Sequence, residues 1–362
     1  MTNFDIDTAD RPFLVIWEVT QACDLSCKHC RASAQPACHP AELSTAEGME
    51  LLEDIRRFGP GQLVVLSGGD PLYRDDIEPL VRHGTDLGLR MTMTPSGTAS
   101  LTSTRIERLL DAGLKRMALS LDGATADQHD EFRGEPGSFE QTIAAARAAA
   151  SHDLPLQINT TVCGETVDVL PAICDLVSDL GAVLWSVFFL VPIGRGRVLN
   201  QLSPERTESV MEWLTEVSQT EPVDVNTTEA PHYRRVALQH GAGPAGSGPP
   251  GDGIGRRAGI TAGDGFVFVG HTGEIYPSGF LPVPAGTVPN DSVVDHYRSS
   301  SLFRRLRDRS NLSGKCGVCE FRNVCGGSRS RAYATTGDPF ASDPLCAYVP
   351  DAFNESPTEG NP

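Results

Sequence analysis

The run Thr20-Gln-Ala-Cys-Asp-Leu-Ser-Cys-Lys-His-Cys-Arg31 directly follows the apolar stretch Phe13–Val19. It places Cys23, Cys27 and Cys30 at C-x3-C-x2-C spacing, in a loop straight after a candidate strand. Thiolates are the soft ligands that suit iron–sulfur chemistry, and three of them can hold three corners of a cubane cluster. The run contains no fourth cysteine, so one iron would stay open for a substrate or cofactor. Structural zinc is the alternative, although it usually takes four protein ligands with C-x2-C pairs.

On the carboxyl side of this loop, short β-branched runs alternate with amphipathic helical patterns up to about Pro192. The candidate strands are Phe13–Val19, Gln62–Ser67, Arg90–Thr94, Arg116–Leu121, Leu156–Val162 and Leu184–Val191. The candidate helices are Thr45–Phe58, Ile77–Leu87, Ser103–Ala112, Phe139–Ala150 and Val169–Leu180. Ser44 and Glu47 form a capping-box pattern before the first helix, and Gly113 is typical of a helix C-terminus.

Repeated strand–helix units predict right-handed crossovers and a parallel α/β sheet. Six units are too few for an eight-stranded barrel, so the pattern predicts a partial (β/α)6 TIM-like barrel with its site at the carboxyl ends of the strands. A doubly wound sheet is the alternative. The predicted organisation is an N-terminal extension (1–12), the barrel (13–240), a Gly/Pro-rich linker (241–257), a small C-terminal domain (258–350) and a disordered tail (351–362). Residues 203–218 suggest one more helix, and 265–277 suggest a β-hairpin.

The chain has 362 residues and a net charge of −17, which argues against a nucleic-acid partner. It contains no run of about 18 apolar residues that could span a membrane. Its acidic N-terminus lacks the basic start and apolar core of a signal peptide. These features predict a cytoplasmic protein, in which clustered cysteines are more often metal ligands than disulfides.

The cysteine spacing resembles that of the radical S-adenosylmethionine (radical SAM) superfamily. The resemblance implies that Cys23, Cys27 and Cys30 hold a [4Fe-4S] cluster whose open iron is chelated by S-adenosylmethionine. In that family, one electron from the cluster cleaves S-adenosylmethionine, and the resulting 5′-deoxyadenosyl radical abstracts hydrogen from an unactivated carbon. The cofactor carries this chemistry, and the protein orients it and excludes water.

Further motifs at strand ends resemble the S-adenosylmethionine contacts of this family. The resemblance implies these cofactor-binding residues: Gly68, Gly69, Asp70 and Pro71 for the methionine amino group, Ser120 and Asp122 for the ribose, Arg133 for the methionine carboxylate, His29 stacked on the adenine, and Asn159 at the pocket wall. Asp70 departs from the family, which has Glu at this position. The alternatives are an ordinary β–α turn for the glycines, an exposed surface residue for Arg133 and an uninvolved loop residue for His29.

A second group of cysteines follows the predicted hairpin: Cys316, Cys319, Cys325 and Cys346, at C-x2-C-x5-C-x20-C. Four cysteines can fully ligate a cubane, and structural zinc is the rival. The surrounding residues resemble the auxiliary-cluster region of SPASM and twitch proteins, which implies one auxiliary [4Fe-4S] cluster. Ser278 and Ser328 stand where relatives often carry further cysteines. Of the remaining cysteines, Cys163 and Cys174 fit a core, and Cys38 lies in a Pro-rich loop.

Within that group the chain resembles the alternative heme and heme d-type biosynthesis branch, which implies a tetrapyrrole substrate with oxidative decarboxylation or removal of a propionate. The alternatives are a peptide maturase acting on a ribosomally made precursor and a non-catalytic iron–sulfur electron-transfer scaffold. The second cluster could accept an electron or bind substrate directly. The implied electron donor is a ferredoxin or flavodoxin. No catalytic residue beyond the cofactor ligands is assigned.

Two arginine-containing segments are candidate binders of an anionic substrate. His232, Tyr233 and Arg234-Arg235 offer an iron ligand, a proton donor and two carboxylate binders. Arg195 and Arg197 follow the sixth strand, at the open end of the predicted barrel. The alternative for both segments is an ordinary solvated loop or helix start.

Overall fold

Seven consecutive strands lie parallel and in chain order in the computed structural model, which describes residues 7–241 and 260–354. They are β1 (Leu14–Glu18), β2 (Leu63–Ser67), β3 (Arg90–Met93), β4 (Arg116–Ser120), β5 (Leu156–Val162), β6 (Leu184–Phe189) and β7 (Asp224–Thr228). On the other side of β1, strand β8 (Phe266–Val269) also pairs in parallel. The antiparallel strands β9 (Glu274–Tyr276) and β10 (Gly286–Thr287) complete the sheet. Because β7 and β10 form its two edges, the barrel is open, and the predicted partial barrel is confirmed.

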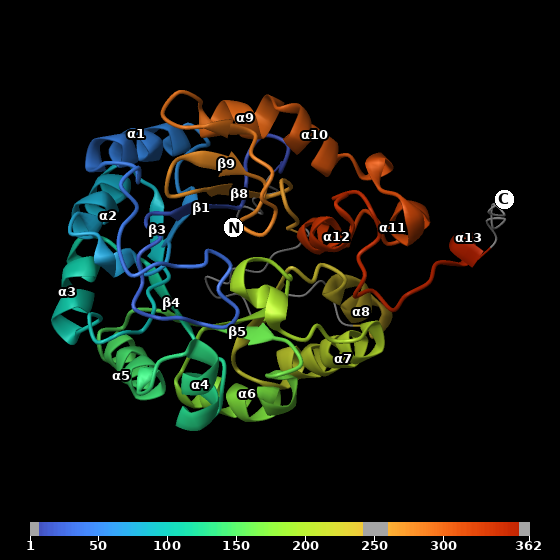
Figure 1. Cartoon of the computed structure of the whole chain (residues 1–362), viewed down its shortest axis with the longest axis horizontal. Helices are drawn as coiled ribbons and strands as arrows, with labels where there is room; N and C mark the ends of the chain where they lie inside the picture. Colours follow the sequence, from blue (N-terminus) through green and yellow to red (C-terminus); the bar gives the residue numbers. More distant parts are fainter. Residues whose placement is uncertain (1–6, 242–259, 355–362) are drawn as a thin grey trace.

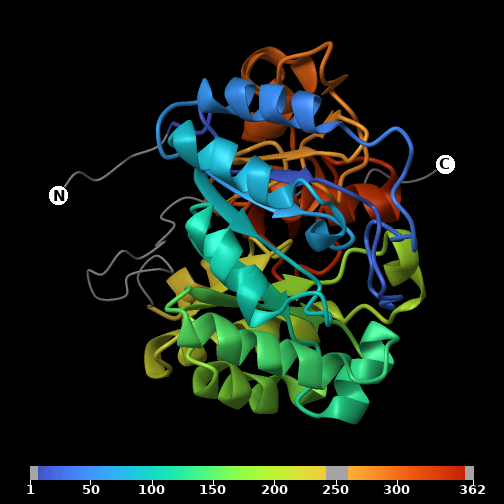
Figure 2. The same cartoon turned by 90° about the vertical axis from the view of Figure 1, so that its left-hand side faces the viewer.

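Helices form a ring outside the strands, as seen down the barrel in Figure 1. Those of the barrel are α1 (Thr45–Arg56), α2 (Ile77–Asp86), α3 (Ser103–Asp111), α4 (Ala126–Arg133), α5 (Ser138–Ser151), α6 (Leu170–Asp179), α7 (Pro204–Thr220) and α8 (Tyr233–Gln239). Those of the C-terminal segment are α9 (Val293–Ser299), α10 (Ser301–Arg307), α11 (Gly314–Val318), α12 (Arg329–Thr336) and α13 (Asp351–Asn354). Short 3-10 turns are η1 (Pro71–Tyr73), η2 (Val167–Val169), η3 (Gly194–Val198) and η4 (Arg309–Asn311). Figure 2 shows α1, α2 and α3 stacked on one flank of the strands.

Local sequence signals explain where several helices begin and end. The hydroxyl of Ser44 accepts the Glu47 amide at 3.3 Å, and the Glu47 carboxylate accepts the Ser44 amide at 2.8 Å. The predicted capping box of α1 is therefore present. Gly113 follows the end of α3 with φ +100, a conformation that favours glycine. The apolar faces of these helices pack on the outward faces of the strands in one large core, in which Trp17 and Trp185 are fully buried.

The sequence pattern did not predict β7, β10, α4 or the short helices α8 to α13. β7 and α4 of the barrel show why. β7 is short and mostly polar, and none of its residues is fully buried, so it lacks the β-branched run of a central strand. α4 is eight residues long and largely polar. Thr125 accepts the amide of Gln128 at its start, and Gly134 with φ +71 ends it. Capping and tertiary position define both elements more than hydrophobic periodicity does.

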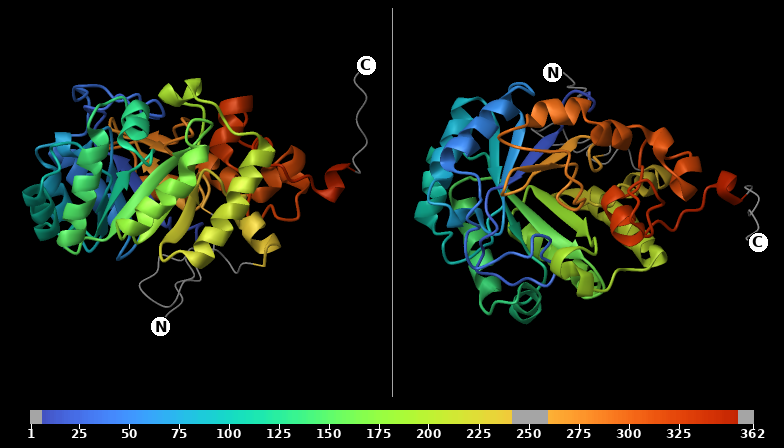
Figure 3. Two further views of the ribbon diagram at one scale, coloured as in Figure 1. Left: turned by 90° about the horizontal axis from the view of Figure 1, so that it is seen from below. Right: turned by 45° about the horizontal axis from the view of Figure 1, so that its top comes forward.

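The C-terminal segment joins the barrel in two places. The predicted hairpin is present as β8–β9, and β8 continues the barrel sheet beside β1 (Figure 3). Arg331 of α12 is fully buried and donates to both oxygens of Asp343 at 3.1 Å. It also donates to the carbonyls of Phe189 at 3.1 Å and Glu229 at 2.7 Å, at the carboxyl ends of β6 and β7. One guanidinium thus fixes α12 over the mouth of the barrel.

Two of the predicted segments, the linker and the C-terminal tail, lie largely outside the described residues. Residues 242–257 of the predicted linker lie outside the described residues, as do residues 355–362 of the predicted tail. Residues 351–354 of that tail form α13, so the prediction of disorder was wrong there. In the described part of the chain, no helix combines the length and the apolar character needed to cross a membrane.

Candidate functional site

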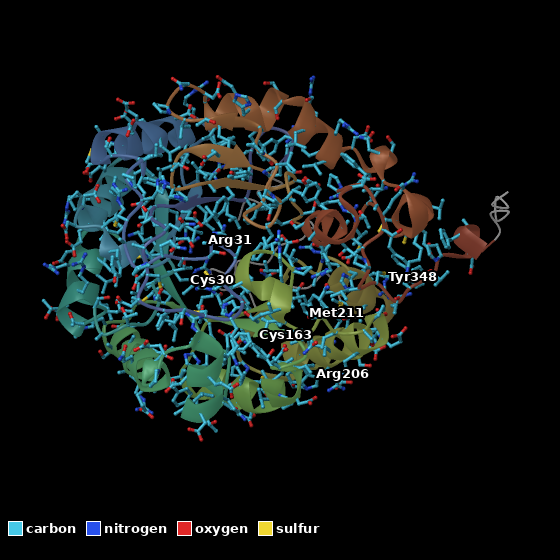
Figure 4. All side chains as sticks on the ribbon, viewed as in Figure 1. Cys30, Arg31, Cys163, Arg206, Met211 and Tyr348 are labelled. Atoms are coloured by element: carbon cyan, nitrogen blue, oxygen red, sulfur yellow. The ribbon has the colours of Figure 1, made fainter. Side chains whose placement is uncertain are left out.

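The three cysteines of the first group lie over the centre of the barrel, as Cys30 shows in Figure 4. Their loop joins β1 to α1 and covers the carboxyl ends of the parallel strands, where a barrel carries its site. A cavity of about 250 Å³, called the upper cavity below, lies beneath the loop. Its walls include Cys23, Cys27, Cys30, His29, Gly68, Gly69, Ser96, Ser120, Arg133, Asn159 and Thr161. The fold therefore brings six of the nine predicted cofactor-binding residues to one cavity with the three cysteines.

Arg195 anchors the cysteine loop from the far side of the barrel. Its Nε donates to the carbonyl of Cys27 at 2.9 Å, and its Nη1 donates to the carbonyl of Ala34 at 3.2 Å. The backbone before it approaches so closely that a Cβ on Gly194 would overlap the Arg31 carbonyl oxygen. Among the described residues its Nη2 has no hydrogen-bond partner, and Arg195 lines the cavity. The interpretation of Arg195 as a substrate binder therefore stays a prediction. Arg197 is exposed.

The thiols sit in surroundings that suit cluster ligands. The amide of Leu25 donates to Cys23 Sγ at 3.3 Å, and the amide of Ala34 donates to Cys30 Sγ at 3.4 Å. Hydrogen bonds of this kind to sulfur are a main way in which proteins tune iron–sulfur groups. Burial raises the pKa of Cys23 and Cys27, so the free thiols hold their protons, and ligation of a metal has to displace them.

The two glycines of the Gly-Gly-Asp-Pro motif are needed by the protein backbone itself. A Cβ on Gly68 would lie 2.6 Å from the Thr20 carbonyl oxygen, and one on Gly69 would overlap the Ala22 carbonyl. The amide of Gly69 donates to Thr20 O at 2.8 Å, and that of Asp70 donates to Ala22 O at 2.6 Å. The end of β2 therefore packs against the start of the cysteine loop, and only glycine permits this approach.

Asp70 and Pro71 lie behind the cavity wall and do not line it. The Asp70 carboxylate accepts the amide of Leu72 at 3.1 Å and the hydroxyl of Thr98 at 3.2 Å. It caps η1, and Pro71 is the first residue of that turn. Burial raises the pKa of Asp70. These contacts give both residues a role in shaping the turn that carries the glycines.

Asp122, Arg133 and His29 form a buried polar group at the cavity edge. Arg133 Nη1 donates to Asp122 Oδ2 at 3.2 Å and lies 3.5 Å from His29 Nε2. The other Asp122 oxygen accepts the Thr161 amide at 2.7 Å, so this carboxylate stands behind the wall. Burial acts to raise the pKa of Asp122, but His29, Arg133 and that amide lower it overall. Arg133 is buried, which excludes the exposed-arginine alternative.

The imidazole ring of His29 packs on a neighbouring side chain and also lines the cavity. Its imidazole stacks on Phe132 with ring centroids 4.9 Å apart and an interplanar angle of 13°. Burial lowers the pKa of His29 to about 4, so the ring is neutral at pH 7. A neutral, stacked imidazole is suited to an aromatic ligand such as a nucleobase, and the role of His29 beside the adenine stays a prediction.

The cavity continues downwards into the barrel. A second cavity of about 150 Å³, called the lower cavity below, shares wall residues with the first, among them Asn159 and Phe188. Its upper wall contains a carboxylate that the sequence reasoning missed. Glu229 directly follows β7 with φ +55, and it accepts hydrogen bonds from the hydroxyls of Ser278 at 3.0 Å, Ser330 at 2.9 Å and Ser328. Two of these serines stand where relatives often carry cysteines, which was the one signal in the sequence.

All four cysteines of the second group line one small cavity near α11, at the edge where Tyr348 lies in Figure 4. Burial raises the pKa of Cys325, and it raises that of Cys346 to about 11. The amide of Gly327 donates to Cys325 Sγ at 3.3 Å. Within residues 7–241 and 260–354, no set of three or more His, Cys, Asp or Glu side chains is arranged to hold a single metal ion.

The segment with His232 and Tyr233 does not present its side chains as a porphyrin-binding set. Both residues are buried and neither lines the barrel cavity. Burial lowers the pKa of His232 to about 4, and Tyr233 donates to the Leu214 carbonyl at 3.4 Å. Arg235 is paired with Glu208 and lines the cavity of the second cysteine group. The predicted substrate role of this segment was wrong for these three side chains.

The sequence resemblance assigns Arg133 to the methionine carboxylate of S-adenosylmethionine, and a substitution tests this prediction. Arg133→Gln is then expected to weaken binding of S-adenosylmethionine by about ten- to a hundredfold, which corresponds to loss of one charge-assisted hydrogen bond. Equilibrium dialysis with the anaerobically reconstituted protein measures the dissociation constant. Lys28→Gln is the matched control, because Lys28 forms an exposed ion pair with Glu131 two residues before Arg133. An unchanged constant in Arg133→Gln would contradict the assignment.

A family model described as the radical SAM superfamily matches residues 17–177. The chain belongs to the radical SAM superfamily, and it is an S-adenosylmethionine-dependent radical enzyme. It is 39% identical to an AdoMet-dependent heme synthase of Methanosarcina barkeri, covering 95% of this chain and 99% of that protein. It is also 39% identical to an AdoMet-dependent heme synthase of Nitratidesulfovibrio vulgaris, covering 93% and 92%. The crystal structure of Streptococcus suis SuiB bound to precursor peptide SuiA has the same fold, with a TM-score of 0.69, 17% identity and coverage of 94% and 76%.

Proposed function

We propose that this enzyme oxidatively modifies propionate side chains of a tetrapyrrole, with an iron porphyrin that is a heme precursor as its substrate. The observation that carries the proposal is the similarity to AdoMet-dependent heme synthases over nearly the whole chain. The two adjoining cavities, one beneath the cysteine loop and one inside the barrel, support it, because a porphyrin needs room beside the cofactor.

The residues of the upper cavity would hold and orient the cofactors. Cys23, Cys27 and Cys30 would hold a [4Fe-4S] cluster that, with bound S-adenosylmethionine, supplies a 5′-deoxyadenosyl radical for hydrogen abstraction. The backbone at Gly68-Gly69 and the side chains of Ser120, Asn159, His29 and Arg133 surround the remaining space. Arg133 brings a positive charge that a methionine carboxylate can use, and Asp122 holds that guanidinium in place.

The proposed reaction converts a propionate into a vinyl group. Removal of one hydrogen atom from the carbon next to the ring leaves a carbon radical. Cleavage of the carbon–carboxylate bond then releases carbon dioxide and one electron and forms the double bond. Cys316, Cys319, Cys325 and Cys346 would hold an auxiliary [4Fe-4S] cluster, which supplies an acceptor for that electron. The buried position of Cys325 and its amide hydrogen bond fit such a group.

A peptide substrate is the second candidate, and one observation favours it. The fold matches that of SuiB in complex with a precursor peptide. At 17% identity this likeness concerns the fold alone, whereas the heme synthases are similar at 39%. The tetrapyrrole is therefore the substrate that we propose.

An anaerobic assay tests the substrate. Reconstituted, dithionite-reduced protein is given S-adenosylmethionine and an iron porphyrin with four propionates, and the porphyrin is analysed by mass spectrometry. We expect the mass to fall by carbon dioxide and two hydrogens for each vinyl group formed, together with 5′-deoxyadenosine. The control contains the porphyrin tetramethyl ester, which cannot lose carbon dioxide. Formation of 5′-deoxyadenosine with an unchanged porphyrin mass would reject the tetrapyrrole proposal.

We further propose that the enzyme works in a reducing compartment such as the cytoplasm, with a ferredoxin or flavodoxin as electron donor. All ten cysteines are free thiols in the structure, and reduced thiols are what cluster ligation requires.

A further inference from the structure

The lower interior of the barrel contains polar side chains among the apolar ones that such barrels usually have. Thr92, Arg116, Gln157, Ser186 and Asn226 of β3 to β7 line the lower cavity, together with apolar residues such as Leu63, Ala118 and Leu184. The interior of a (β/α) barrel is normally filled with layers of bulky branched apolar residues. Burial of a polar side chain costs free energy of desolvation unless the side chain forms hydrogen bonds. Each of these side chains therefore needs a partner within the protein or in a bound ligand.

Arg116 is the charged residue in this layer, and it lacks such a pairing. It is the first residue of β4, opposite Thr92 of β3, and it is 5% exposed. Its Nη1 is buried and has no hydrogen-bond partner. The neighbouring charge that affects it is that of Arg90, another cation. Burial and Arg90 lower the pKa of Arg116 to about 10, so the guanidinium still carries its charge at neutral pH.

The other buried arginines in the described part of the chain all have partners. Arg74 pairs with Asp76, Arg133 with Asp122, Arg235 with Glu208 and Arg331 with Asp343. Arg329 donates to the carbonyls of Gly327, Pro339 and Ala341. Among these buried arginines, Arg116 alone has neither a carboxylate nor a carbonyl acceptor within residues 7–241 and 260–354. An unpaired buried guanidinium is costly, and it is the state expected of a group that waits for an anion.

We propose that Arg116 binds a carboxylate of the substrate inside the barrel. The inference rests on the proposed function, because a porphyrin with several propionates can place one at the cofactor and another deeper in the cavity. Arg116 and Ser120 are the two ends of β4, and Ser120 lines the cofactor cavity. Four residues of strand span roughly 13 Å, so the two positions suit different side chains of one large ring.

The other charged groups that line this space do not compete with Arg116 for that carboxylate. The Glu229 carboxylate repels a second anion and is held by Ser278, Ser328 and Ser330. The Arg329 guanidinium is used by backbone carbonyls. Arg116 is thus the cation that a propionate meets in the lower cavity. Because a guanidinium can take a carboxylate with two parallel hydrogen bonds, it also fixes the orientation of the ring.

Titration of the reconstituted protein with the iron porphyrin tetra-acid, followed by its absorbance, tests this assignment. We expect Arg116→Met to raise the dissociation constant by about ten- to a hundredfold and Arg116→Lys to give a smaller rise. Arg90→Met is the matched control, since Arg90 is an exposed cation at the same end of the neighbouring strand. S-Adenosylmethionine cleavage without porphyrin should be unchanged in all three variants.

Two further readouts separate a binding role from a structural one. The wild type should prefer the tetra-acid over its tetramethyl ester, and Arg116→Met should lose this preference. The melting temperature of the porphyrin-free Arg116→Met protein should stay equal or rise, because an unpaired buried charge is removed. Equal binding of the tetra-acid by Arg116→Met and wild type, or a lowered melting temperature with an unaltered acid-to-ester preference, overturns the role of Arg116. A wild type that binds no iron porphyrin overturns the proposed function, and this inference with it.

Discussion

Replacing Cys23, Cys27 and Cys30 with alanine in one protein is expected to reduce formation of 5′-deoxyadenosine from S-adenosylmethionine to the buffer background. The three thiols line the upper cavity together, and the described residues offer no other cysteine there. Since the cofactor carries the chemistry, loss of its ligands leaves the protein nothing with which to cleave a sulfonium. Anaerobic reconstitution, reduction with dithionite and chromatography of the nucleoside products measure the effect.

The control for this variant also removes cysteines, but only ones that lie outside the cavity. Cys38 is exposed and Cys174 is buried on α6, and neither lines the upper cavity. The double variant Cys38→Ala, Cys174→Ala should cleave S-adenosylmethionine within a fewfold of wild type. Iron analysis of the triple variant should show about four iron atoms fewer per chain. Cleavage at the wild-type rate by the triple variant would refute the assignment of these cysteines.

Replacing Cys316 and Cys346 with alanine is expected to separate cleavage of S-adenosylmethionine from formation of the vinyl product. The second cysteine group lines a cavity of its own, apart from the residues that line the upper cavity. Cleavage of S-adenosylmethionine should therefore continue, whereas vinyl product should fall to background because the electron released with carbon dioxide has no acceptor. The measurement is the ratio of vinyl product to 5′-deoxyadenosine, with both quantified in one reaction.

Metal analysis distinguishes the proposed second cluster from structural zinc. Wild type should contain about eight iron atoms per chain, and the Cys316→Ala, Cys346→Ala variant about four. Four iron atoms and one zinc ion in the wild type would assign the second site to structural zinc. Retained vinyl formation in the variant would show that the electron leaves by another route.

Sequence periodicity predicted the elements whose residues carry their own signal. The six strands from β1 to β6 are short, largely apolar runs separated by helical patterns, and each was predicted to within two residues at either end. The capping box at Ser44 and Glu47 is a local pattern, and it fixed the start of α1. β7 was missed because its inward residues Asn226 and Thr228 face a cavity and not a core, so its pattern is polar.

The candidate site shows the same division between local and distant information. The spacing of Cys23, Cys27 and Cys30 can be seen within eight residues of sequence. The role of Gly69 cannot, because it depends on the carbonyl of Ala22, which belongs to the strand-to-loop connection next to it in space. Likewise, the sequence offered Arg195 as a substrate binder, and only the folded chain shows it bonded to the loop around Cys27.

The sequence by itself determined the chemistry that this protein can support and the class of fold that carries it. Cysteine spacing and hydrophobic periodicity depend only on residues close together in the chain, so they can be recognised without the fold. The tertiary structure decided which polar groups are satisfied. Arg331 and Arg116 look alike in the sequence, yet one is saturated by Asp343 and backbone carbonyls, and the other has no acceptor among the described residues. Whether a buried charge is paired depends on contacts between residues far apart in the chain, and those contacts exist only after folding.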